Sequence, residues 1–207
     1  MKYISSANHP VVTHTRSLGK AHSIKKSKDF MVEGIRAAEP FFKHGFICKA
    51  LLATEEHYKR HGLAKYVAVE QYVAPASLLQ SLSHHEQNSG VIAIFQKPEY
   101  QPIVPHTLDK VLILDHVQDP GNVGTLIRTA AACEYKVVLS YKSAHVWNWK
   151  VIQASAGTLA LVHVIEMNSP EEIRACISSA RPIIGLSVEG NLLKKTPIDA
   201  QQAVVVG

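Results

Sequence analysis

The sequence predicts an α/β protein made of two parts, and three observations lead to this fold class. Short runs of β-branched and other apolar residues alternate with segments of helical character along the whole chain. A proline-rich stretch at residues 98–107 interrupts this alternation near the middle of the 207 residues. The basic excess lies entirely in the first hundred residues, so the two parts also differ in charge.

The first part, residues 1–97, is predicted to be a small α/β domain. The clearest helix spans residues 75–83. Pro40 lies within a stretch that otherwise has helical character, and proline has no backbone N–H. We therefore expect the helix to break, kink or begin near Pro40. Four apolar runs have the composition of strands, at residues 30–34, 48–53, 66–70 and 90–95.

The second part, residues 108–207, is predicted to contain a parallel sheet. Residues 98–107 hold three prolines without helical or strand periodicity, which predicts an interdomain linker. The best marked helix spans residues 170–180, because Ser169 begins an S-x-x-E capping box. Five β-branched runs without strict polar alternation are typical of strands buried on both faces, at residues 111–114, 136–140, 161–166, 182–188 and 203–207.

Composition excludes several classes of protein. Hydrophobic residues make up 46% and charged residues 19%, as in globular domains and unlike disordered chains. No apolar run reaches the roughly 18 residues of a membrane span, and the first residues lack the apolar region of a signal peptide. We therefore expect a cytoplasmic protein without a membrane partner. Cys48, Cys133 and Cys176 lie far apart, which argues against a disulfide framework or a zinc site.

Positive charge concentrates near the N-terminus. Residues 1–100 carry 13 Lys and Arg against 8 Asp and Glu, whereas residues 101–207 carry 9 of each. A polyanion would meet this basic face first. An ordinary solvated basic stretch accounts for the same charges equally well, and charge alone does not choose between the two. The candidate contacts are Arg16, Lys25, Lys26, Lys28 and Arg36.

The most informative segment follows the first predicted strand of the second part. Asp119-Pro120-Gly121-Asn122 has strong turn chemistry, and we expect a helix to start near Gly124. Arg128 then falls in the second turn, from which its side chain can point back over the loop of Asn122. An amide and a guanidinium converging there would fix a phosphate or a ribose hydroxyl. Alternatively, Asn122 only makes the turn and Arg128 is a surface residue.

The remaining candidate residues have plainer roles. Asp115, His116 and Asp119 would suggest a metal only if a fourth ligand joined them, and we expect no metal. Trp147 and Trp149 would stack on bases in a nucleic-acid complex, but a core or dimer contact is the more common role of such residues.

The segment DPGNVGTLIRTAA resembles the first signature motif of the SpoU (TrmH-type) family of RNA ribose 2′-O-methyltransferases, in the SPOUT class. Residues 150–164, KVIQASAGTLALVHV, are similar to that family's stretch around a Ser-x-Gly. The segments FMVEGIRAAEP and NSGVIAIFQKPE are similar to its N-terminal RNA-binding domain. The resemblance covers essentially the whole chain.

This resemblance implies methyl transfer from S-adenosylmethionine to a ribose 2′-hydroxyl of structured RNA, either rRNA or tRNA. It further implies a homodimer with active sites at the subunit interface and a parallel sheet that is knotted when complete. Arg128 and Asn122 match the family's catalytic Arg and Asn. A guanidinium, whose pKa exceeds about 12, is a poor proton acceptor, so we favour orientation and charge stabilisation for Arg128. The basic residues of the first part would be RNA contacts.

The end of the chain departs from the family pattern. The second motif would begin at Gly207 and the third would follow it, and in the family both build the donor pocket. We therefore expect the cofactor-binding residues at and beyond Gly207. A strand as apolar as 203–207 also needs a covering helix, so we expect the second domain to continue past this point. The alternative function is a non-catalytic RNA-binding protein or an inactive fragment of such an enzyme.

Overall fold

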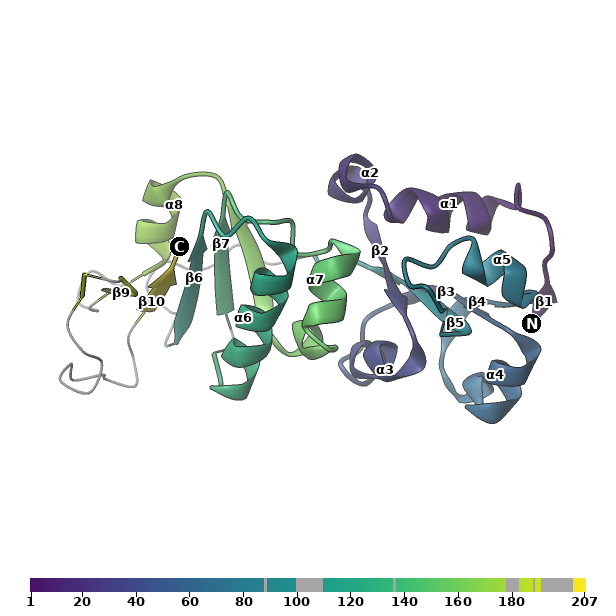
Figure 1. Cartoon of the computed structure of the whole chain (residues 1–207). Helices are drawn as coiled ribbons and strands as arrows, with labels where there is room; N and C mark the ends of the chain where they lie inside the picture. Colours follow the sequence, from purple (N-terminus) through teal and green to yellow (C-terminus); the bar gives the residue numbers. More distant parts are fainter. Residues whose placement is uncertain (88, 100–109, 136, 178–182, 188, 191–202) are drawn as a thin grey trace.

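The chain forms two five-stranded sheets with helices packed against them (Figure 1), which confirms the predicted α/β class. The computed structural model describes all residues except 88, 100–109, 136, 178–182, 188 and 191–202. Within the described residues, no helix has the length and apolar character needed to cross a bilayer. Most of the linker 98–107 lies outside the described residues, so the boundaries at residues 97 and 108 stay a prediction.

The first sheet is mixed and has the strand order β1-β4-β3-β5-β2. β4 runs parallel to β1 and β3, whereas β5 is antiparallel to both β3 and β2. All four predicted strands are present, although the predicted strand 66–70 begins later and extends further. The strands are β1 (Lys2–Tyr3), β2 (Asp29–Glu33), β3 (Cys48–Ala53), β4 (Ala68–Val73) and β5 (Val91–Gln96).

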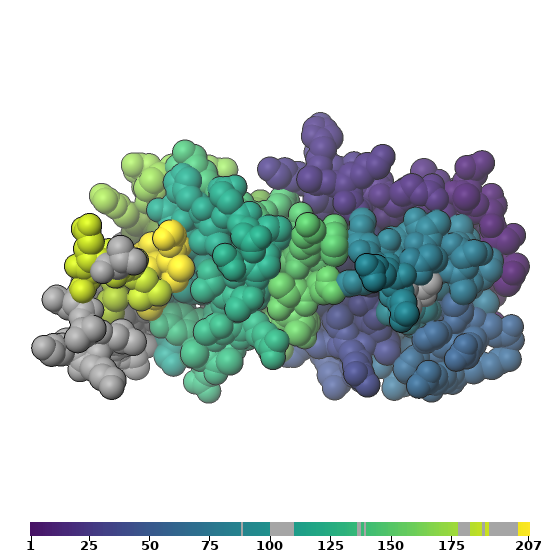
Figure 2. Space-filling model, viewed as in Figure 1, coloured from purple at the N-terminus to yellow at the C-terminus, as the bar shows by residue number. Residues whose placement is uncertain are grey.

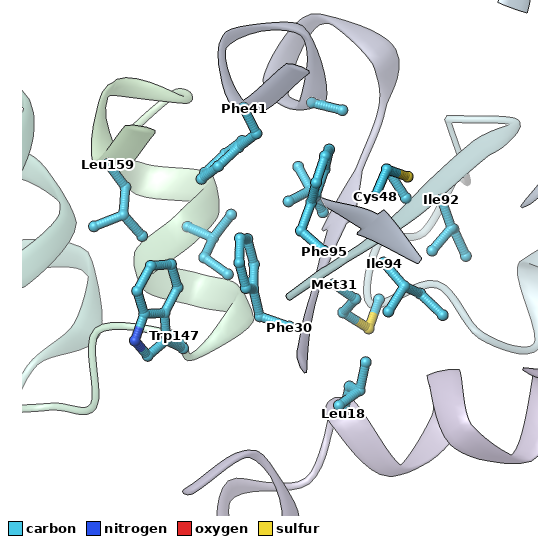
Figure 3. Packing of buried hydrophobic residues seen from close by; sticks show 14 of the residues in the cluster. Leu18, Phe30, Met31, Phe41, Cys48, Ile92, Ile94, Phe95, Trp147 and Leu159 are labelled. Atoms are coloured by element: carbon cyan, nitrogen blue, oxygen red, sulfur yellow. The ribbon is translucent and has the colours of Figure 1, made fainter. Parts of the chain in front are cut away.

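Helices cover both faces of this sheet. Figure 3 shows Leu18 of α1 against Met31 on one face of β2, and Phe41 of α3 on the side of Phe30. Since adjacent residues of a strand point to opposite faces, α1 and α3 lie on opposite sides. The helices are α1 (Pro10–Leu18), α2 (Ala21–Lys26), α3 (Ile35–Lys43), α4 (Glu55–Arg60), the 3₁₀ turn η1 (Leu63–Lys65) and α5 (Ala76–Gln80).

Helix α3 begins at Ile35 and runs through Pro40, so the expectation of a break or a helix start near this residue was wrong, whereas a kink there stays a prediction. Proline removes only its own N–H, which would have bonded the carbonyl of Arg36. Since α3 ends at Lys43, a single ladder bond is lost near the last turn. Burial of Ala38 and Phe41, both fully buried, holds the helix in place despite this loss.

The second sheet is entirely parallel, as predicted, with the strand order β8-β7-β6-β10-β9. Its strands are β6 (Val111–Asp115), β7 (Val137–Tyr141), β8 (His163–Met167), β9 (Ile183–Gly185) and β10 (Ala203–Val206). The other elements are α6 (Pro120–Ala132), α7 (Trp149–Ala154), the 3₁₀ turn η2 (Thr158–Leu161) and α8 (Pro170–Cys176).

The predicted cap of α8 is confirmed at its N-terminus. Ser169 accepts a hydrogen bond from the backbone N–H of Glu172 at 3.2 Å. The Glu172 carboxylate reaches back one residue further than in a standard capping box and accepts from the Asn168 N–H at 2.8 Å. The helix ends at Cys176, earlier than the predicted residue 180, and residues 178–180 lie outside the described part.

One aromatic cluster joins the two sheets (Figure 3), and in the space-filling view the two halves are in contact along their boundary (Figure 2). Trp147, 6% exposed, lies with its ring centroid 4.5 Å from that of Phe30 in β2. Phe41 and Phe95 complete the cluster around Phe30, at centroid distances of 5.3 and 5.7 Å. The core interpretation of Trp147 is therefore confirmed, and both halves share one hydrophobic core.

The Ser-x-Gly stretch forms part of this contact. Gly157 has φ +85°, and a Cβ at this position would lie 2.7 Å from Cγ of Pro40 and 3.1 Å from the carbonyl oxygen of Ala37. Only glycine suits both the left-handed backbone and the close approach of α3. Ser155, fully buried, donates to the Ile152 carbonyl at 2.7 Å and ends α7. This stretch therefore positions α3 against the second half.

Candidate active site

The carboxyl ends of β6 and β10 define the candidate site. From β6 the chain winds through β7 to β8 on one side, then crosses to β9 and β10 on the other. In open α/β sheets, ligands bind at such a switch point, beyond the carboxyl ends of the strands. β6 ends at Asp115 and β10 at Val206, and a Cβ on Gly207 would lie 2.5 Å from the Asp115 carbonyl oxygen.

The loop after β6 has a constrained backbone. His116 adopts a left-handed conformation with φ +57°, and its N–H donates to the Tyr141 carbonyl at 3.0 Å. The His116 ring lies edge-on to the Tyr141 ring, with Nδ1 2.6 Å from a carboxylate oxygen of Asp115. These contacts hold a non-glycine residue in a rarely populated conformation at the proposed ligand edge.

Ser143 joins the loops after β6 and β7. Its Oγ accepts a hydrogen bond from the Val117 N–H at 2.9 Å and lies 3.2 Å from the Leu114 carbonyl, to which it can donate. The Ala144 N–H donates to the Val117 carbonyl at 2.9 Å. Sequence reasoning missed Ser143. The rule that ligands meet strand carboxyl ends would have selected it, because it lies two residues after the end of β7.

Helix α6 begins at Pro120, four residues before the predicted start at Gly124. The Asp119 carboxylate caps the helix by accepting from the Asn122 N–H at 2.8 Å, and Pro120 occupies the first turn. Asn122 is therefore a first-turn helical residue whose side chain is exposed. The early start also corrects the position of Arg128, which lies in the third turn rather than the second.

Asn122 and Arg128 lie on the same helix with exposed side chains. Six residues of α-helix separate their Cα atoms by about 9 Å along the axis. In the described part of the chain, the Arg128 guanidinium has no hydrogen bond or ion pair. Arg128 is therefore an exposed cation without a described partner, in the third turn of the helix that begins beside this edge. The catalytic roles of both residues stay a prediction.

Gly124 serves the contact between α6 and α7 instead of starting the helix. A Cβ here would lie 2.5 Å from Cβ of Ala154 and 2.6 Å from the Val151 carbonyl oxygen. The two helix backbones therefore cross closely at Gly124. This crossing ties the candidate site to the aromatic cluster between the sheets.

The candidate basic residues lie on both sides of the first sheet. Arg16 of α1, Lys25 and Lys26 of α2, and the nearby Lys28 are all exposed or partly exposed. Helices α1 and α2 lie on one side of the first sheet, whereas Arg36 of α3 lies on the other (Figure 1). The structure therefore groups four of the five and separates Arg36. Among the described residues, no three of His, Cys, Asp or Glu lie together as a metal site would require.

The whole chain is similar to known RNA methyltransferases. It is 27% identical over 209 residues to the 23S rRNA (guanosine(2553)-2′-O)-methyltransferase RlmP of Bacillus subtilis, covering 100% of this chain and 82% of that protein. A structure of a TrmH-family RNA methyltransferase from Porphyromonas gingivalis superposes with a TM-score of 0.80 and 27% identity, covering 98% and 80% of the two chains.

A second structure has the same fold. It is the SpoU methyltransferase AviRb of Streptomyces viridochromogenes in complex with AdoMet, with a TM-score of 0.80 and 22% identity over 96% of this chain and 80% of that one. With the parallel sheet and its switch-point edge, these likenesses define the protein as an RNA methyltransferase of the α/β class. More narrowly, residues 109–207 match the SpoU rRNA Methylase family.

Proposed function

We propose that this protein transfers the methyl group of S-adenosylmethionine to a ribose 2′-hydroxyl of ribosomal RNA at the carboxyl edge of β6 and β10. The observation that carries this proposal is the capped helix α6, which begins beside this edge with Asn122 in its first turn and carries Arg128, unpaired in the part of the chain that the structure describes, in its third turn. Its RNA substrate would be 23S rRNA, on which RlmP of B. subtilis acts.

The protein backbone at the carboxyl edge suits the methyl donor. At Gly207 the chain passes so close to Asp115 that a side chain has no room, so only backbone atoms line this part of the edge. We assign donor binding to backbone groups at Val206 and Gly207 and to the loop after Asp115. When bound, S-adenosylmethionine supplies a methyl group on a positively charged sulfur.

Arg128 and Asn122 would act on the RNA. We assign to Arg128 the orientation of the ribose and its adjacent phosphate, and the stabilisation of charge developing on the 2′-oxygen. The Asn122 amide would fix the same nucleotide by hydrogen bonding. Holding acceptor and donor in line supplies much of the rate in such a transfer, and it requires no proton acceptor from the guanidinium.

We also propose how the rest of the molecule serves this reaction. The basic residues of α1 and α2 would bind the phosphates of structured RNA, and their exposure supports this role. Two copies would form a homodimer that completes the site at the carboxyl edge. We further propose that the protein works in the cytoplasm.

Transfer of a labelled methyl group tests the function. The chain is incubated with [³H-methyl]-S-adenosylmethionine and unmodified 23S rRNA transcribed in vitro, and the RNA is digested to nucleosides. We expect the label in one 2′-O-methylated nucleoside, and its loss in the Asn122→Ala variant. Label on a base would contradict the proposal. Tight RNA binding without transfer would favour the non-catalytic RNA-binding protein.

A further inference from the structure

A groove lies between α2 and the second sheet and is lined from both halves. It consists of two adjoining cavities of about 290 and 240 Å³, both bordered by Lys25, His145 and Glu166. The larger reaches Lys28 and Lys97, and the smaller reaches Lys142 and Ser143 beyond β7. We call this the junction groove, lined by Lys25, Lys28, Lys97, Lys142, His145 and Glu166.

Positive charge dominates the junction groove. Four lysines line it against the carboxylates of Glu166 and Glu99. Lys97 is held in place, since its Nζ donates to the Ile24 carbonyl at 2.5 Å, and burial lowers the pKa of its ammonium. Lys25 and Lys142 are exposed on opposite sides, and in the described part of the chain neither pairs with a carboxylate. The Lys142 ammonium lies over the Tyr141 ring, 5.1 Å from its centroid, a contact that leaves its positive charge without a described anionic partner. Both lysines can therefore receive an anion.

His145 adds a fixed hydrogen-bond donor at the centre. Its side chain is only 10% exposed, and its Nδ1 accepts from the Trp147 N–H at 3.2 Å. The neutral ring therefore carries its proton on Nε2. Burial lowers the pKa of His145, and the positive charges of Lys97 and Lys25 lower it further, against the opposing effect of Glu166. The Glu166 carboxylate lies 3.6 Å from Nδ1, too far for a hydrogen bond.

The junction groove leads to the candidate site. Lys142 follows Tyr141, whose carbonyl accepts from the His116 N–H, and the Gln118 side chain donates to the Lys142 carbonyl. The same backbone therefore lines the groove and supports the loop after β6. A chain of phosphates lying between Lys25 and Lys142 would continue toward the edge where Asn122 stands.

We propose that the junction groove binds consecutive phosphates of the RNA backbone, with Lys25 from the first half and Lys142 from the second on the same strand. This inference rests on the proposed function, which makes RNA the substrate. An elongated, open groove with lysines at both ends suits a repeating polyanion better than a single small anion. Binding would also fix the first half relative to the second while the ribose is presented to α6.

Salt dependence of RNA binding tests the groove. The probe is a fluorescein-labelled 30-nucleotide RNA hairpin, titrated by anisotropy between 50 and 250 mM KCl. We expect Lys25→Gln and Lys142→Gln each to lower the slope of log K against log salt by about 0.7–0.9, and the double variant by about twice as much. Lys59→Gln on α4, an exposed lysine paired with Glu55, is the matched control and should keep the wild-type slope.

Two further measurements separate the possible failures. Inorganic phosphate at constant ionic strength should not displace the hairpin; displacement at millimolar phosphate would assign the groove to a free anion and overturn the proposal. Methyl transfer to 23S rRNA is measured on the same variants. Transfer by the wild type with unchanged slopes in both lysine variants would overturn the groove alone. A lysine-dependent slope without transfer would support the groove and reject the proposed function.

Discussion

Arg128 is a cation with no partner among the described residues, and this isolation makes it the sharpest single-residue test. We expect Arg128→Ala to lower methyl transfer by about 100- to 1000-fold, as loss of a positioned charge-stabilising group does elsewhere. The free energy of unfolding should change by at most about 0.5 kcal/mol, because the side chain is exposed and alanine favours helix.

The matched control for this prediction is Arg174→Ala, which removes another exposed arginine from a helix, α8, on the opposite face of the second sheet from α6. It should retain wild-type transfer and stability. Turnover of Arg128→Ala within a few-fold of wild type would reject the role assigned to the guanidinium. Radiolabel incorporation and urea denaturation measure the two effects separately.

Single residues also show how far sequence reasoning reached. Turn chemistry and spacing predict the pair of Asn122 and Arg128. They place Arg128 in the second turn of the helix, one turn too early. The Asp119 carboxylate caps the helix, so the helix starts earlier than predicted. In the sequence, an aspartate of this kind fits a turn as well as a helix cap, and the prediction chose the turn. The position of Ser143 after a predicted strand was the signal that could have selected it. His145 gives no local signal, because its importance comes from contacts between segments distant in the chain.

At the scale of elements, the crossing of α6 and α7 positions the candidate site. Gly124→Ala places a methyl group where Ala154 and Val151 already lie, at 2.5 and 2.6 Å. We expect it to lower the free energy of unfolding by about 1–3 kcal/mol through overpacking, although alanine is intrinsically the better helix former. Urea denaturation followed by circular dichroism measures this.

Gly185→Ala in β9 provides the comparison for Gly124, since a Cβ there meets nothing within 4 Å. It should change stability by no more than about 0.5 kcal/mol. Equal stabilities of the two variants would show that α6 and α7 can separate at little cost, contrary to the close crossing.

Predicted and observed elements differ for identifiable reasons. Long buried runs such as Val111–Asp115 were found because β-branched residues without polar alternation are typical of strands covered on both faces. The sequence analysis did not predict the strand β1, which has only two residues, or the helices α1, α2 and α4. α4 has no buried residue, so no apolar stripe marks it, and it is held by its Thr54 cap and the Lys59 and Glu55 pair. β1 exists only because β4 offers it an edge.

At the scale of the whole molecule, two histidines with shifted pKa values lie at the junction between the halves. The His84 ring stacks on that of Trp149, with centroids 4.4 Å apart and planes 7° from parallel, and His145 accepts a hydrogen bond from the backbone N–H of Trp147. Burial lowers the pKa of both histidines. For His84, Glu33 opposes this shift and His85 adds to it, whereas for His145 Glu166 opposes it and Lys97 and Lys25 add to it.

Acidification is therefore expected to loosen the junction. When the halves separate, both histidines regain an ordinary pKa near 6.5, so the open form binds protons that the closed form does not. The contribution of these groups is fully present above about pH 6.5 and declines as the pH falls below it. Trp147 and Trp149 are the chain's only tryptophans, and both lie at the junction, so their fluorescence reports its state directly.

We expect the emission to shift to longer wavelength between pH 7 and pH 5.5, while the far-ultraviolet circular dichroism stays constant. His84→Gln should weaken the shift, because glutamine cannot gain a charge beside Trp149, whereas His22→Gln on the exposed surface of α2 should leave it unchanged. Emission that stays constant over this range would show that the halves remain closed when these histidines are protonated. Since the junction groove spans the same boundary, RNA should oppose the shift: a bound phosphate chain favours the closed form and stabilises protonated His145.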